Sequence, residues 1–260
     1  MALFLPNFRE NIEYNLHYMS VIGKYFIFLG TLFGKGEKLG VYWRRFMEEC
    51  VGIGVSSIFI VAIVSTFIGA VSCIQTAYNL VSPIIPVSTV ALIVRDMQLL
   101  ELAPTITCIV LAGKVGSNIA SELGTMRITE QIDALEVMGI NSSSYLVLPK
   151  VLAAMFTFPM LVIFAAFLGI FGGYLAGTLT GVITERDYLY GIRDSFVPYN
   201  IFFMCVKPFV FGFLIATISS FQGYFTEGGA LEVGKASTQA VTNSCIAVLI
   251  ADYLLAQLLL

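Results

Sequence analysis

An isolated carboxylate within an apolar stretch has the clearest chemical potential in this sequence. Glu101 lies in a segment that we expect to cross a membrane, and Pro104 follows three positions later. A carboxylate at that depth costs about 2.5–3.5 kcal/mol on insertion scales and normally faces a cavity or a partner. The proline ring clashes with the carbonyl of Leu100, which predicts a kink. Glu101 therefore either lines a cavity or ties its helix to Gln98, Arg95 or another span.

A second candidate site is a short amphipathic helix, predicted over residues 122–138, that is too short to cross a bilayer. Apolar residues recur at helical spacing on one face, and acidic residues follow another side. These are Ile128, Ile132 and Leu135 on the first, and Glu130, Asp133 and Glu136 on the second. Gly139 then provides a stop signal. Such a helix can dock in the groove of a soluble partner, or it can be a solvated connector.

Other chemistry has little support in the sequence. The lone His17 has no partner pattern, and the five cysteines are widely spaced without a CxxC pair, so we expect neither a metal site nor a disulfide framework. Residues 113–117 and 228–237 superficially resemble phosphate loops, but both fail the GxxxxGK[ST] spacing and follow no strand. We therefore expect no nucleotide site in this chain. The absence of a basic run argues against nucleic acid as a partner.

The composition shows which elements must position these residues. Hydrophobic residues make up 58% of the chain and charged residues 12%, against about 25% charged in soluble domains. No Asp, Glu, Lys or Arg occurs between Glu49 and Arg95, or between Lys150 and Glu185. Both stretches exceed the roughly 20 apolar residues that a membrane-crossing helix needs. Since lipid satisfies no backbone polar group, these stretches must be helical.

The pattern predicts an all-α membrane protein with a single domain over residues 1–260. We expect an N-terminal interfacial helix at residues 12–34, and about five transmembrane helices. The five spans are predicted at about 51–80, 87–114, 151–182, 201–223 and 236–258. Glycines recur at every fourth position from Gly169 to Gly181, which permits close helix approach within the chain or at a subunit interface.

Basic residues predict the orientation of these spans. With a cytoplasmic N-terminus, ten of the fourteen Lys and Arg residues lie on the inner side. The four expected on the outer side are Arg95, Arg186, Arg193 and Lys207. The N-terminus lacks the pattern of a cleavable signal.

Four segments of the chain resemble the MlaE-type ABC transporter permease family. They are Glu101–Pro104, Ala112–Ser117, Glu122–Leu135 and the glycine-containing run at 228–238. The resemblance extends over residues 50–258. It implies a multi-pass permease of the bacterial inner membrane that moves phospholipids between the inner and outer membranes. Such permeases work as homodimers with a cytoplasmic ABC ATPase, which binds the ATP, and a periplasmic MCE-domain protein, so no cofactor or enzymatic activity is expected in this chain.

The same resemblance suggests roles for individual residues. Glu101 matches the cavity glutamate of the family, while Leu100 stands where the family often has arginine. Three further residues are expected on the lipid pathway: Gln75, Phe67 and Leu102. Residues 122–138 correspond to the coupling helix that contacts the ATPase. Its expected contact residues are Glu122, Arg127, Glu130, Gln131, Asp133 and Leu135.

Three other functions remain to be weighed. A permease for another hydrophobic or small solute is the main alternative, although a hydrophilic solute would need more polar residues along a central path than these spans provide. An intramembrane enzyme would need paired catalytic groups, whereas Glu101 and Asp252 are isolated in the sequence. A purely structural scaffold is opposed by the resemblance of residues 122–138 to a coupling helix.

Overall fold

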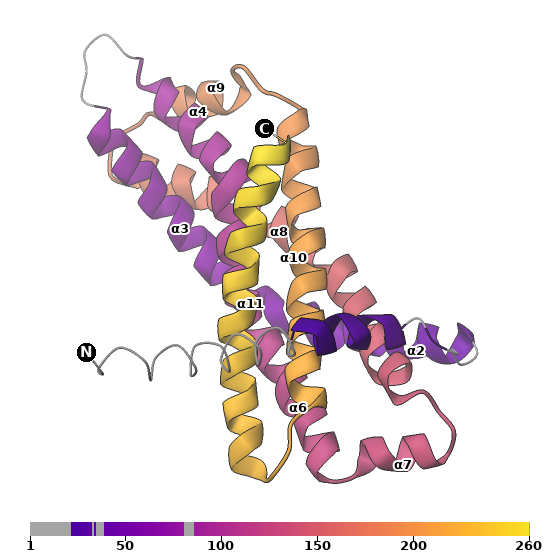
Figure 1. Ribbon diagram of the computed structural model, residues 1–260. Helices are drawn as coiled ribbons and strands as arrows, with labels where there is room; N and C mark the ends of the chain where they lie inside the picture. Colours follow the sequence, from indigo (N-terminus) through magenta and orange to yellow (C-terminus); the bar gives the residue numbers. More distant parts are fainter. Residues whose placement is uncertain (1–21, 33, 35–38, 81–85, 260) are drawn as a thin grey trace, which may run out of the picture.

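The computed structural model describes residues 22–32, 34, 39–80 and 86–259. Within those ranges the chain is helical apart from short turns, and no strand occurs (Figure 1). The all-α prediction is therefore confirmed. Part of the expected interfacial helix, residues 12–21, lies outside the described residues. Its described part is a helix over Ile22–Leu32, which lies across the direction of the long helices in Figure 1.

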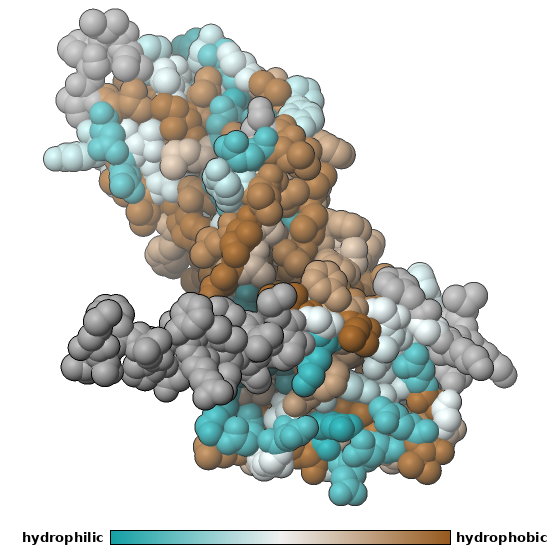
Figure 2. Space-filling view, in the orientation of Figure 1, coloured by the Kyte–Doolittle hydropathy of each residue, from teal (hydrophilic) through white to brown (hydrophobic). Residues whose placement is uncertain are grey.

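Within the described ranges, five helical stretches are long and apolar enough to cross a membrane, as predicted. They are Gly40–Asn79, Ser88–Ile128, Ser142–Leu179, Tyr199–Tyr224 and Ala230–Leu259. In Figure 2 a broad apolar surface separates two more polar ends. One end carries α7 and the start of α11 and is called here the α7 end; the other carries α9 and the C-terminus and is called the α9 end (Figure 1).

The first stretch contains two helices that meet at a turn. Most residues between the predicted interfacial helix and the first predicted span belong to α2 (Leu39–Ile53). A single 3-10 turn, η1 (Val55–Ser57), leads from α2 into α3 (Ile58–Asn79). The 22 residues of α3 rise about 33 Å, which suffices to cross the hydrocarbon core. The crossing therefore needs only α3, and the amphipathic α2 is a separate helix that precedes it.

The second stretch is one continuous rod with two π-helical segments. Its parts are α4 (Ser88–Met97), η2 (Gln98–Ile106), α5 (Thr107–Leu111), η3 (Ala112–Gly116) and α6 (Ser117–Ile128). Pro104 lies inside η2, so the expected kink takes the form of a local change in helix pitch. Because Pro104 has no N–H, it donates no backbone hydrogen bond within this segment.

The predicted single helix at 122–138 is wrong in its bounds. Its first part belongs to α6, which continues the second span, and α7 comprises only Gln131–Val137. Between them Glu130 adopts a left-handed backbone conformation with φ 59°. The Thr129 hydroxyl donates to the carbonyl of Thr125 at 2.7 Å and offers the backbone an alternative to further helix. The apolar spacing continues across this turn, which is why it predicts one helix.

The remaining elements complete the bundle. They are α8 (Ser142–Leu179), α9 (Glu185–Arg193), α10 (Tyr199–Tyr224) and α11 (Ala230–Leu259). The short α9 covers one end: the buried Tyr188 hydroxyl donates to the carbonyl of Ile170 at 2.8 Å. Burial raises the pKa of Tyr188 well above its usual range, so the phenol remains a donor. The buried Arg95 donates to the carbonyls of Ile192 and Asp194, which joins α4 to α9.

Glycines bring α3 and α8 into backbone contact. A Cβ atom at Gly69 would collide with the carbonyl of Gly169, and one at Gly172 would collide with the carbonyl of Thr66. A Cβ at Gly173 would come within 2.6 Å of the Tyr188 hydroxyl. Three of the four glycines in the predicted pattern, Gly169, Gly173 and Gly177, therefore serve helix packing inside this chain, whereas Gly181 lies beyond the end of α8.

Valine at Gly69 should disrupt this contact. We expect Gly69→Val to destabilise the protein by at least about 1–3 kcal/mol, because backbone cannot yield to the added side chain. The thermal unfolding midpoint in detergent measures the effect. The control is Gly234→Ala, since no atom lies within 4 Å of a Cβ placed at this helical position. Equal midpoints for Gly69→Val and the wild type would contradict the close contact.

Candidate functional site

Three helices meet at a buried lysine. The ammonium of Lys207, on α10, donates to the carbonyl of Leu100 at 2.9 Å and to Glu101 Oε1 at 2.7 Å. Its Nζ also lies 2.7 Å from Asp252 Oδ1 on α11, in an ion pair that lacks the angle of a hydrogen bond. The Lys207 side chain is 0% exposed. The ammonium thus joins the second span, α10 and α11 at one point.

The proline of the second span lies close to this site in the sequence. The carbonyl of Leu100, four residues before Pro104 in the π-helical η2, accepts a hydrogen bond from Lys207. The ring of Phe203 lies 4.6 Å from the ammonium and adds a cation–π contact. A buried cation is tolerated only when its charge is compensated and its donors find acceptors. Here Glu101 and Asp252 compensate the charge, and Leu100 and Glu101 accept two hydrogen bonds from the ammonium.

Glu101 is the accessible member of this cluster. Its side chain is 47% exposed, against 16% for Asp252. Thr105 donates to its second oxygen at 3.2 Å. Of the two roles predicted for Glu101, the tie to another span is present, and its partner is Lys207 rather than Gln98 or Arg95. The carboxylate is held in place while still facing outward.

The expected outer position of Lys207 among loop charges is wrong. This lysine lies within α10, between apolar residues on both sides, and carries no exposed surface. The sequence signal was available, since a lysine inside an apolar run must find an acidic partner. Asp252 has a similar apolar neighbourhood in α11. Glu101 and Asp252 are isolated in the sequence, yet both pair with Lys207 in the structure.

The other predicted pathway residues lie on two spans. Phe67 is 68% exposed on α3, Gln75 is exposed on the same helix, and Leu102 is half-buried in η2 beside Glu101. None of them forms a hydrogen bond with Glu101 in the described structure. Phe67 belongs to an exposed apolar stripe along α3, and α11 presents a similar face. The α3 stripe is Phe59, Ile63, Phe67, Val71, Ile74 and Tyr78; the α11 face is Ile246, Leu249, Ile250, Tyr253, Leu254 and Leu258.

Several predicted coupling residues are bound within the chain. Glu122 Oε2 and Glu49 Oε1 lie 2.7 and 2.6 Å from the buried ammonium of Lys150 on α8. Arg127 donates to Asp133 at 2.6 Å across the α6–α7 turn. These pairs fix the α7 end to the bundle, rather than presenting all of these charges to solvent.

The outward surface of α7 differs from the prediction. Leu135 packs against the core, while Glu130 and Gln131 are exposed. Two residues that the sequence reasoning missed, Val137 and Met138, are 89% and 64% exposed. They directly precede the helix-ending Gly139, and their exposure follows from the fold rather than from the sequence pattern. The α7 tip therefore offers an apolar pair beside polar groups.

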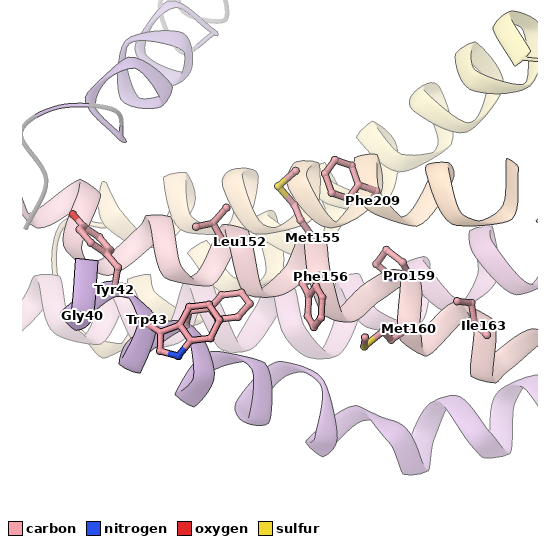
Figure 3. A pocket seen from close by; sticks show the side chains of 11 residues that line it. Gly40, Tyr42, Trp43, Leu152, Met155, Phe156, Pro159, Met160, Ile163 and Phe209 are labelled. Carbon is pink, nitrogen blue, oxygen red and sulfur yellow. The ribbon is translucent and has the colours of Figure 1, made fainter. Parts of the chain in front are cut away.

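An apolar groove of about 910 Å³ lies between α2 and α8 (Figure 3). Trp43 and Phe46 border it from α2, Phe156 and Met160 from α8, and Phe209 from α10. No charged side chain lines it in the described structure. Its chemistry suits a hydrocarbon chain.

Removing the buried ammonium should destabilise the bundle. We expect Lys207→Met to cost about 3–5 kcal/mol, because Asp252 and Glu101 lose their shared cation. The matched control is Lys235→Met, which removes an exposed pair with Glu232 and should cost about 1 kcal/mol or less. Thermal unfolding of both variants in one detergent makes the comparison. Similar midpoints for the two variants would contradict the proposed stabilising role of Lys207.

Comparison with known proteins places the chain in a family. The family described as Permease MlaE matches residues 46–258. A "Probable ABC transporter permease protein" of Rickettsia bellii is 38% identical over 91% of each chain. "Protein TRIGALACTOSYLDIACYLGLYCEROL 1, chloroplastic" of Arabidopsis thaliana is 32% identical over 83% of this chain and 61% of that protein. The Haemophilus influenzae "Intermembrane phospholipid transport system permease protein MlaE" is 26% identical over 88% of each chain. The described residues include five helices long and apolar enough to cross a membrane, and the family match extends over most of the chain, so the chain belongs to the MlaE permease family of multi-pass membrane transport proteins.

Proposed function

We propose that this permease moves phospholipids between the inner and outer membranes of a bacterium, as the membrane subunit of an ABC transporter. The observation that carries the proposal is the half-exposed Glu101 carboxylate, held by a fully buried Lys207 within an apolar span. A polar group fixed beside exposed apolar faces suits an amphiphile with a polar headgroup and hydrocarbon chains. The name of the Haemophilus influenzae relative, an intermembrane phospholipid permease, supports the same substrate.

In this proposal the exposed faces of α3 and α11 contact acyl chains, and two copies of the chain enclose the lipid between them. Phe67 and Leu102 supply apolar contacts, while Gln75 and Glu101 lie toward the headgroup. Exposed apolar surface of this extent is stable only against lipid or another protein. The chain carries out no covalent chemistry, binds no cofactor of its own and takes its energy from ATP bound by a partner.

The second span provides a direct mechanical link. Ser88–Ile128 is one continuous rod, with Glu101 within it and α7 attached at its end. The Arg127–Asp133 pair braces the turn, and Glu136 accepts hydrogen bonds from Ser142 and Tyr224. A push on α7 is therefore transmitted to α6 and along the rod. We propose that a cytoplasmic ABC ATPase supplies this push through Glu130, Gln131 and the exposed tip of α7.

The proposed setting follows from this assignment. The α7 end and the N-terminus lie in the cytoplasm of a cell whose inner membrane holds the protein, and a periplasmic MCE-domain protein receives or delivers lipid at the α9 end. The alternative cargo is another hydrophobic or small solute. The apolar groove between α2 and α8 and the exposed faces of α3 and α11 favour a lipid over a hydrophilic solute.

Purification from the native membrane in mild detergent tests the assignment. We expect an ABC ATPase, an MCE-domain protein and phospholipid to co-elute with the chain. If the ATPase co-elutes together with a different bound solute, that solute would be assigned as the cargo in place of phospholipid. A chain that elutes without any ATPase in several detergents would contradict the transporter proposal.

The exposed tip of α7 gives a sharper test of coupling. We expect the double variant Val137→Asp, Met138→Asp to lower ATPase retention at least about tenfold, because two desolvated apolar contacts are lost. The unfolding midpoint should remain unchanged, since both side chains are exposed. The control is Val197→Asp, a 50% exposed position at the α9 end. Normal retention by the double variant would exclude this surface from the interface.

A further inference from the structure

A polar pocket lies apart from the Glu101 site. It encloses about 560 Å³ where the α2–α3 junction, the second span and α11 meet. Its polar lining comes from Ser56, Lys114, Ser117, Asn118, Ser121 and Ser237. Lys114 is thirteen residues beyond Glu101 on the same rod, which places it about 20 Å along the helix axis toward the α7 end.

Hydrogen-bond donors are in excess in this pocket. Lys114, Asn118 and Ser121 follow one face of the rod at positions i, i+4 and i+7. The Lys114 ammonium donates to the carbonyl of Ser56, which leaves two of its three N–H groups available. The side chains of Asn118 and Ser121 donate to no acceptor in the described parts of the chain. A pocket with this surplus of donors is suited to an anion with several oxygens.

The nearby acidic groups form no ion pair with Lys114. Glu49 and Glu122 share the ammonium of Lys150, and Glu232 pairs with Lys235. Across the described residues, no carboxylate lies within ion-pair distance of Lys114. An anionic group that enters the pocket would therefore meet an ammonium whose printed contact is to a backbone carbonyl, that of Ser56.

The surroundings of the pocket indicate an amphiphile. Ser56 lies one helical turn before Phe59, where the exposed apolar stripe of α3 begins. A ligand whose anionic group occupies the pocket can thus lay a hydrocarbon chain along Phe59 and Ile63. The basic, donor-rich pocket complements the anionic headgroup of a phospholipid, and the neighbouring apolar stripe complements its acyl chains.

We propose that this pocket binds the phosphate group of a phospholipid, whose acyl chain lies along α3. The inference rests on the proposed lipid-transport function and adds a second headgroup position to it. Lys114 supplies the charge, Asn118 and Ser121 supply directed donors, and Ser237 closes the pocket from α11. The two polar positions, one basic and one acidic, lie about 20 Å apart on a single rod.

Lipid binding by the purified, delipidated full-length protein tests this site. The probes are phosphatidylglycerol, diacylglycerol with the same chains, and inorganic phosphate, and native mass spectrometry counts the bound molecules. We expect phosphatidylglycerol to bind in preference to diacylglycerol. Lys114→Gln and Asn118→Asp should each weaken that binding about tenfold, as expected for loss of a charge-assisted hydrogen bond.

Two controls keep the outcome interpretable. Asn118 is exposed, so its nearly isosteric change to aspartate should leave the fold intact while placing a negative charge in the pocket. Asn79→Asp makes the same change at the exposed end of α3 and should bind like the wild type. Equal binding of phosphatidylglycerol by all variants overturns the proposal. Binding of inorganic phosphate with the same dependence on Asn118, without lipid binding, overturns the assignment to a lipid.

This experiment needs neither ATP nor a partner, so its failure is distinct from failure of the transporter proposal. Co-elution of an ATPase and phospholipid, together with unaltered binding by Asn118→Asp, would remove only this site. Binding of phosphatidylglycerol that depends on Asn118, in a chain that recruits no ATPase, would support the site and contradict the transport proposal.

Discussion

The burial of one ammonium group constrains the whole bundle. A lysine side chain with no exposed surface cannot remain charged in an apolar interior without near neighbours of opposite charge. Lys207 obtains them from two other helices, so α10, α11 and the second span must keep their relative positions. The lysine also donates to the backbone carbonyl of Leu100 in the π-helical η2. The ion pair with Lys207 thus holds the half-exposed Glu101 carboxylate in one position among apolar side chains.

A second lysine organises the other end of the molecule. Lys150 lies between Glu49 and Glu122, and so joins α8 to α2 and to the far end of the second span. The second span therefore contacts one buried lysine at Leu100 and Glu101 and another at Glu122, with the Lys114 pocket between them. Movement of α6 relative to α8 must either shift the Lys150 side chain or separate it from Glu122. Coupling and stability consequently share the same few contacts at this end of the protein.

Much of the fold could be predicted from charge-free stretches, because lipid leaves helices as the only solution for them. The five spans and the isolated Glu101 followed from that constraint. The break at Glu130 could not, since a one-residue turn leaves the apolar spacing of Ile128 and Ile132 continuous. The partners of Glu101 were equally inaccessible, because Lys207 and Asp252 lie more than a hundred residues away in sequence and only packing brings them together. Val137 and Met138 belong to the same class, since exposure depends on the surrounding fold.

The outward faces of α3 and α11 have a consequence for how this chain tolerates change. Most of their large apolar side chains contribute little to the packing of the chain itself. Conservative apolar substitutions there should leave folding almost untouched while altering whatever the faces contact. Substitutions at Lys207 or Gly69 should instead impair folding, because contacts within the chain leave no room for another side chain at Gly69 and no other cation for the partners of Lys207. The interior contacts therefore determine stability, while the outward faces can vary. Cargo preference can change through substitutions on these faces without lowering the stability of the fold.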